Sequence, residues 1–361
     1  GPPPPPPAPR PGQQRPFPSK ASAGMMNLSD GSTKHAWWSI SDEFVSAALE
    51  RDSAQEDAAE ARQRKDKRGE ALALRRLARA RVAEIDELIW EATGDFDRIA
   101  EMAFEDAESI AREHLQETKA THDRWGEAVM LLTMAEVDKE RKHYYNAKVS
   151  EFAPVLDKAM AARDAFSEMD DKQMEAYAWV VAADVHRRSE QAPSSWRIGA
   201  NQTFDALDQS LLLFDETQDI QGTAMAKHMM ALAYMHRNEV GEAVRLMEDA
   251  RDGFTRAGNK RLEAYELDWM AEVHMLKKSG REALPNAEEA LEIYKEIMPK
   301  SRRLADTRTS LVKAHLKRGD DETALRLAIE HVEMAEEQTR PRPLGIALMA
   351  LASTYAMLGR F

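Results

Sequence analysis

The chain has 361 residues, of which 43% are hydrophobic and 31% are charged, so it can bury a core and is long enough for two or more domains. Its net charge of -13 argues against a protein whose whole surface binds nucleic acid or an anionic membrane, and no apolar run is long enough to span a bilayer. The absence of cysteine excludes disulfides, thiolate metal sites and cysteine nucleophiles.

Residues 1–36 are predicted to form a disordered, proline-rich tail. Ten of the sixteen prolines fall within the first twenty residues, in GPPPPPPAPRPGQQRPFPSK. Such a segment has too little apolar surface to offset the entropy of ordering, so it favours the polyproline II conformation. We expect it to be a spacer; the alternative is a binding site for a polyproline-binding module such as an SH3 or WW domain.

Residues 37–122 are predicted to form an N-terminal helical region. A charged helix is expected over residues 41–66, followed by a divergent first hairpin or cap in which Ala100 and Ala107 lie seven residues apart. Residues 62–81 carry nine basic and two acidic side chains. An apolar stripe that includes Leu74 and Leu77 runs through this stretch, so its arginines are expected to form a solvated helix face. The alternative is that they attract nucleic acid or an acidic partner.

Two repeated patterns run through residues 123–361, where apolar residues recur at the three- and four-residue spacing of helices. The first pattern places His186, His236, His274 and His315 in equivalent positions, with Tyr355 in the same position near the end. The second pattern pairs a small residue with an aromatic one four residues later. Its pairs are Ala162 with Phe166, Ser210 with Phe214, Ala250 with Phe254, Ala290 with Tyr294, and a variant pair of His331 with Ala335.

Turn signals separate these patterns, so each repeat is predicted to be a helical hairpin. The order of Ala271, His274, Gly280, Ala283 and Ala290 resembles the tetratricopeptide repeat, in a long form of about 40 residues. The resemblance implies an all-α fold: a right-handed α-solenoid of about five and a half hairpins over residues 123–361. It also implies a sixth hairpin whose second helix would follow Phe361.

The resemblance further implies that partners bind in the concave groove lined by the first helix of each hairpin. Mapping the inward-facing positions of the family onto this chain predicts a basic, aromatic surface suited to an acidic peptide or helix. The predicted partner-binding residues are Tyr177, Arg187, Arg188, Lys227, Tyr234, Arg237, Asn238 and Tyr265.

No catalytic motif is recognisable in the sequence. The four histidines in equivalent positions are interpreted as packing residues, because stacked hairpins hold them too far apart to share one metal ion. We therefore expect a non-enzymatic, cytoplasmic scaffold that needs no cofactor or metal and binds a protein or peptide. The alternative is a regulatory or sensing module of a larger enzyme or transcription regulator.

Overall fold

A computed structural model describes residues 46–92, 94–189, 199–277, 279–299, 301–337 and 341–359. These residues form fourteen α-helices and one 3₁₀ helix and contain no strand, so the predicted all-α fold class is confirmed. The α-helices are α1 (Ala47–Arg64), α2 (Lys67–Glu91), α3 (Phe96–Ala120), α4 (Arg124–Tyr144), α5 (Ala153–Glu168), α6 (Lys172–Ser189), α7 (Gly199–Thr217), α8 (Ile220–His236), α9 (Val240–Ala257), α10 (Lys260–Leu276), α11 (Gly280–Ile297), α12 (Arg302–Arg318), α13 (Asp321–Glu337) and α14 (Pro341–Met357).

The 3₁₀ helix, η2 (Val149–Phe152), precedes α5. The predicted proline-rich tail and its polyproline-binding partner lie outside the described residues, so both stay predictions, as do the boundaries expected for the N-terminal region and the repeat array. None of the described helices combines the length and apolarity that a membrane span requires.

Side chains in the loops fix where the even-numbered helices begin. Asp66, Asp123 and Asp219 each accept a hydrogen bond from the backbone N–H three residues later, at 3.0, 3.0 and 2.7 Å. Asn259 and Ser301 do the same for α10 and α12. Each bond satisfies one of the N–H groups that the first helical turn leaves without a partner. The polar loops of the sequence therefore supply the N-caps of the helices that follow them.

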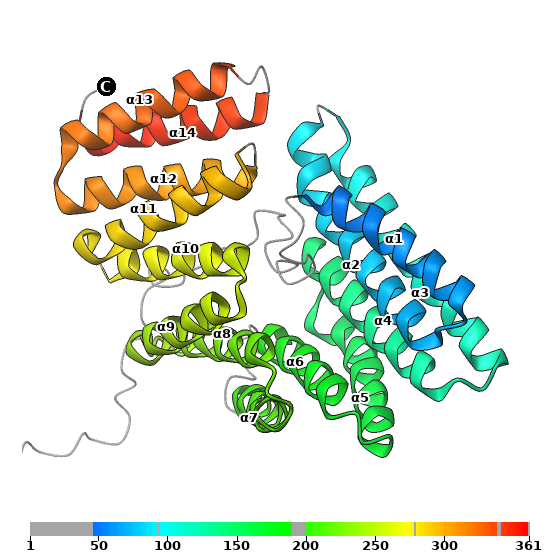
Figure 1. Cartoon of the computed structure of the whole chain (residues 1–361). Coiled ribbons are helices and arrows are strands. Elements are labelled where there is room, and N and C mark those ends of the chain that lie inside the picture. Colours follow the sequence, from blue (N-terminus) through cyan, green and yellow to red (C-terminus); the bar gives the residue numbers. More distant parts are fainter. Residues whose placement is uncertain are drawn as a thin grey trace, which may run out of the picture. The chain divides into compact units, whose positions relative to one another are not determined.

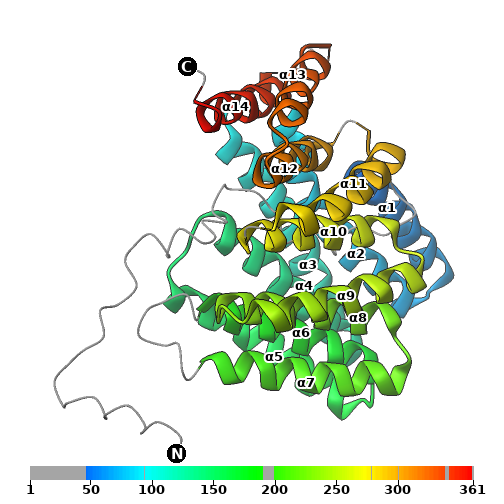
Figure 2. The same cartoon turned by 90° about the vertical axis from the view of Figure 1, so that its left-hand side faces the viewer.

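Successive helices pack as antiparallel pairs in chain order (Figures 1 and 2). In addition, α4 contacts α6, α6 contacts α8, α10 contacts α12, and α12 contacts α14. No comparable contacts join the successive odd-numbered helices from α5 to α13 within the described residues. The even-numbered helices are therefore the inner members of the repeats, and we call them the inner helices; the odd-numbered helices from α5 to α13 are called the outer helices.

The second sequence pattern marks the packing surface of the outer helices. All ten of its residues are buried, with at most 2% of their surface exposed. The Phe214 ring of α7, for example, lies 5.1 Å between centroids from the Tyr177 ring of α6 and faces Gly222 of α8, so it fills space between three helices. His331 occupies a small-residue position and is buried there as well. The repeat that the sequence predicts is therefore present as repeated packing.

A glycine permits the close approach of α11 to α12. A Cβ atom added at Gly280 would lie 2.6 Å from the carbonyl oxygen of Ala314 and 2.7 Å from the backbone nitrogen of Arg318. These atoms belong to the backbone of α12 and cannot move independently. A Cβ atom added at Gly241, in the first turn of α9, would have no other atom within 4 Å.

We therefore predict that Gly280→Ala lowers the free energy of unfolding by about 1–3 kcal/mol, because the added methyl group forces α11 and α12 apart. Gly241→Ala is the matched control. It should leave stability unchanged or raise it by about 0.4–1 kcal/mol, since alanine restricts the unfolded chain. Urea unfolding followed by circular dichroism measures both, and equal effects would contradict the proposed close contact.

Candidate partner-binding surface

The eight residues predicted to bind a partner fall into three environments. Arg187, Arg188 and Tyr265 are buried, whereas Tyr177, Lys227 and Tyr234 are half-buried. Arg237 and Asn238 are exposed where α8 ends. The structure therefore leaves two of the eight side chains exposed to solvent and encloses the others partly or wholly within the protein.

The two buried arginines belong to an ion-pair network between α4 and α6. Arg187 is 2% exposed and Arg188 is 5% exposed. The Asp184 carboxylate accepts a 2.5 Å bond from Arg187 and a 3.0 Å bond from Arg188, and it lies 2.9 Å from the Nζ atom of Lys139. Lys139 also lies 3.0 Å from Glu140. Both arginines therefore help to hold the inner helices together, and partner binding by them stays a prediction.

The charges around Asp184 control its protonation. Burial alone would raise the pKa of this carboxyl group, but the positive charges of Arg188, Lys139 and Arg187 outweigh burial and hold the pKa well below its usual range. Asp184 is therefore ionised throughout the physiological range. Its negative charge compensates for the buried cations, which would otherwise carry a large desolvation cost.

A second buried pair joins α2 to α4. Arg75 donates to both carboxylate oxygens of Glu136, at 2.8 and 3.1 Å, and its guanidinium lies 5.4 Å from the ring centroid of Tyr177. Tyr177 in turn donates a hydrogen bond to Asp219 at 2.9 Å. The solvated face expected for residues 62–81 is therefore wrong for Arg75. Its carboxylate partner is 61 residues away in the sequence, so local pattern could not show the pairing.

The network extends to α8 through a histidine. Arg187 Nη1 lies 3.2 Å from Nε2 of His236. Burial, together with the nearby positive charge of Arg187, lowers the pKa of His236 to about 4. The ring is therefore neutral at pH 7, and its Nε2 atom accepts the hydrogen bond from Arg187. His236 is one of the four equivalent histidines, and its role agrees with the packing interpretation.

The accessible part of the predicted surface is an aromatic and basic cluster where the end of α8 lies beside the N-terminal part of α7. Arg237 lies with its guanidinium 4.2 Å from the ring centroid of Phe204. Phe204 makes an edge-to-face contact with Tyr234 at a centroid distance of 4.8 Å. Asn238 follows directly and has a positive φ of 62°. We call Arg237, Phe204, Tyr234 and Asn238 the Arg237 cluster. Phe204 was not among the predicted residues, because it lies on an outer helix.

Lys227 and Tyr265 have partners of their own. Lys227 Nζ lies 3.0 Å from Asp249 of α9. The Tyr265 ring is covered by Arg303 of α12, whose guanidinium lies 5.0 Å from the ring centroid. The Lys227 contact joins the two helices of one hairpin, and the Tyr265 contact joins the inner helices of two successive repeats.

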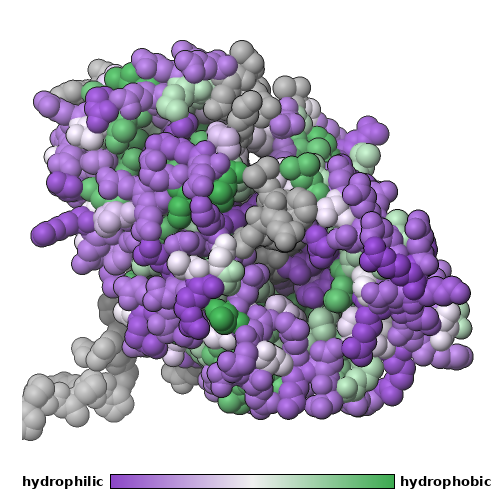
Figure 3. All heavy atoms as spheres, in the orientation of Figure 1, coloured by the Kyte–Doolittle hydropathy of each residue, from purple (hydrophilic) through white to green (hydrophobic). Residues whose placement is uncertain are grey.

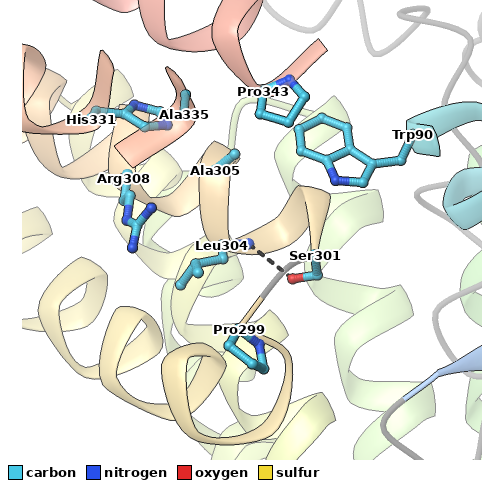
Figure 4. Close-up of a pocket in the computed structure, with 9 residues that line it drawn as sticks. All are labelled: Trp90, Pro299, Ser301, Leu304, Ala305, Arg308, His331, Ala335 and Pro343. Atoms are coloured by element: carbon cyan, nitrogen blue, oxygen red, sulfur yellow. Dashed lines mark hydrogen bonds between the residues drawn. The ribbon is translucent and has the colours of Figure 1, made fainter. Parts of the chain in front are cut away.

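A small cavity lies among α2, α12, α13 and α14 (Figure 4). Its lining residues include Trp90, Arg308 and His331. Its volume is about 10 Å³, which leaves room for about one water molecule. Burial, with a contribution from Arg308, lowers the pKa of His331 to about 4, so the ring is neutral at pH 7. This cavity suits a bound water and is too small for an organic ligand.

Breaking the ion-pair network should destabilise the protein. We predict that Asp184→Asn lowers the free energy of unfolding by about 3–5 kcal/mol, because it leaves buried cations without their shared carboxylate. Asp52→Asn is the control, since Asp52 forms an exposed pair with Arg51 and should cost at most about 1 kcal/mol. If the two variants lose the same free energy of unfolding in chemical denaturation, the buried network contributes no more to stability than an exposed ion pair does.

The lowered pKa of His236 predicts a dependence of stability on pH. Between pH 6.5 and pH 4 the unfolded state binds a proton at this histidine and the folded state does not, so stability falls as the pH falls. The expected loss from His236 between pH 7 and pH 5 is roughly 1–2 kcal/mol. His236→Gln keeps a hydrogen-bond acceptor for Arg187 but cannot titrate, so its urea midpoint should fall less over this range. If the urea midpoint falls equally in both proteins, the lowered pKa of His236 is contradicted.

Comparison with known proteins shows the fold. No protein-family model and no curated protein matches the sequence. The structure resembles a signal-transduction ATPase with numerous domains (STAND) that has a tetratricopeptide repeat sensor, from Pyrococcus horikoshii. The TM-score is 0.54 at 15% identity, over 88% of this chain and 45% of that protein. It also resembles the apo form of RapI, with a TM-score of 0.53 at 12% identity, over 86% of each chain. The chain therefore has a helical-repeat fold.

Proposed function

We propose that this chain is a non-enzymatic protein-interaction module of the tetratricopeptide repeat type, which binds a peptide or helix of an acidic partner at its inner helices. Three observations support the proposal: the repeated packing of small and aromatic residues, the helical-repeat fold of the similar structures, and a basic cluster at an inner-helix end. Repeat proteins of this kind present extended surfaces made from equivalent positions of successive repeats.

The Arg237 cluster is the observation that carries the proposal. An exposed arginine above an aromatic ring is held in one orientation, so it loses little conformational entropy when it binds. Its planar guanidinium can make two parallel hydrogen bonds to a carboxylate. Arginine and tyrosine are also the residues most often found as energetic centres of protein interfaces. The cluster therefore has the composition of an anchor for an acidic side chain.

The surface chemistry favours recognition by charge. Figure 3 shows one face of the molecule, on which hydrophobic side chains form small, separate groups among hydrophilic ones. A partner bound by charge complementarity would associate faster at low salt and weaken as salt screens the attraction. The chain as a whole carries a net charge of -13, so a local basic cluster would also guide an acidic partner to one place.

A second candidate function is a sensing or regulatory module within a larger enzyme or transcription regulator. The STAND protein supports it, because that protein contains a tetratricopeptide repeat sensor and this chain covers 45% of its length. In this case the Arg237 cluster would bind another domain of the same polypeptide. An effector domain in the same natural reading frame would favour this second function over the first.

We predict that Arg237→Glu weakens binding of a partner purified by pull-down at least about tenfold, because it replaces attraction to a carboxylate by repulsion. Arg326→Glu makes the same charge change at another exposed position, on α13, and should leave the Kd unchanged. Isothermal titration measures both, and melting curves verify that both variants fold. Equal Kd values for the two variants and the unaltered protein would remove the Arg237 cluster from the binding site.

A further inference from the structure

Three metal-ligating side chains meet where α2 begins and α3 ends. Glu70, His114 and Glu117 each place one ligand atom so that all three atoms lie within 4.8 Å of one another. This is the one such group of three among the described residues. It lies apart from the Arg237 cluster in the sequence and on different helices.

Helix geometry explains why these residues meet. His114 and Glu117 are three residues apart on α3, so their side chains lie on the same face. Glu70 lies in the first turn of α2, and α2 and α3 form an antiparallel pair. The start of α2 therefore lies beside the last turns of α3. The sequence does not show the group, because Glu70 and His114 are far apart in the chain.

The histidine supplies a second, independent indication of a ligand. His114 is 7% exposed, and its Nδ1 atom is buried without a hydrogen-bond partner. The same atom lies 3.4 Å from Oε2 of Glu117, so it is directed into the group. A buried polar atom without a partner costs free energy, and a metal ion bound by the ring nitrogen would remove that cost.

An arginine already places positive charge at this position. Arg62, at the end of α1, donates from Nε to Glu70 at 2.5 Å and from Nη2 to Glu117 at 3.4 Å. Its side chain is 63% exposed, so it can move into solvent at little cost. The two carboxylates are thus already arranged around a cation, and a divalent ion would compete with Arg62 for them.

We propose that Glu70, His114 and Glu117 form a zinc site from which the ion displaces Arg62. One imidazole nitrogen and two carboxylate oxygens are ligands that zinc accepts, and a water molecule would complete four-coordination. Imidazole favours zinc over magnesium and calcium, which prefer oxygen ligands alone. In tetrahedral zinc sites the ligand atoms are about 3.4 Å apart, so the side chains must approach each other slightly after Arg62 leaves. The ion would join the start of α2 to the end of α3.

The test is titration of the full chain, first treated with a chelator, with zinc chloride in a calorimeter. We expect a site that His114→Ala and Glu70→Gln each weaken at least tenfold. Arg62→Ala should bind zinc at least several-fold more tightly, because the competing cation is gone. His122→Asn is the matched control, because His122 is an exposed histidine just after the end of α3. Its replacement should leave the affinity for zinc unchanged.

Melting curves provide a second readout. At the same zinc concentration, the Tm of the unaltered protein and of Arg62→Ala should rise more than that of Glu70→Gln, because stabilisation by a ligand of the folded state grows with its affinity. If His114→Ala fails to fold, Glu70→Gln and Arg62→Ala still decide the question. The proposal is overturned if no zinc binds, if zinc binds equally to all variants as adventitious surface binding only, or if Arg62→Ala binds more weakly.

Discussion

The structure depends on one packing constraint: a helical hairpin cannot bury its apolar face alone. The outer helices α5, α7, α9 and α11 each present a small residue and an aromatic residue four positions later, and both are buried by neighbouring helices. Phe166, Phe214 and Phe254 each occupy this position in successive repeats. The packing of these residues fixes the distance and rotation between neighbouring hairpins. It therefore also fixes which side chains of the inner helices meet. Burial at these positions therefore helps to set the geometry of the polar contacts between the inner helices that these outer helices cover.

The polar networks follow from that geometry. Once α4 and α6 are packed, the side chains of Lys139, Asp184 and Arg188 have no access to water and must satisfy one another. Such a network contributes little net stability compared with apolar packing, but a wrong helix register would leave buried charges unpaired at a cost of several kcal/mol. The ion pairs therefore select one arrangement of the inner helices. Apolar packing supplies the stability, and buried charge supplies the specificity of the register.

The sequence predicted the features that depend on local pattern. The all-α class, the hairpin turns and the buried positions of the second pattern all follow from spacing, because helical period and turn chemistry are properties of neighbouring residues. The candidate surface was less predictable. Arg187 occupies a position in α6 where the repeat family has a groove residue. Its burial depends on contacts with α4 and α8, so the local sequence of α6 could not show it. Glu70 and His114 meet through the pairing of two helices, and Phe204 joins the Arg237 cluster from an outer helix.

Arg187 and Arg237 occupy equivalent basic positions of two successive inner helices but lie in opposite environments, one buried and one exposed. Both lie at the ends of inner helices, and Arg187 touches His236, the residue before Arg237. Arg187 faces Asp184 and is enclosed by neighbouring helices, so its charge is satisfied internally. Arg237 lies beyond the last turn of α8, where its guanidinium covers an aromatic ring and remains accessible to solvent. Through its contact with His236, Arg187 thus links the buried network to the end of α8, and the next residue along the chain is the exposed Arg237.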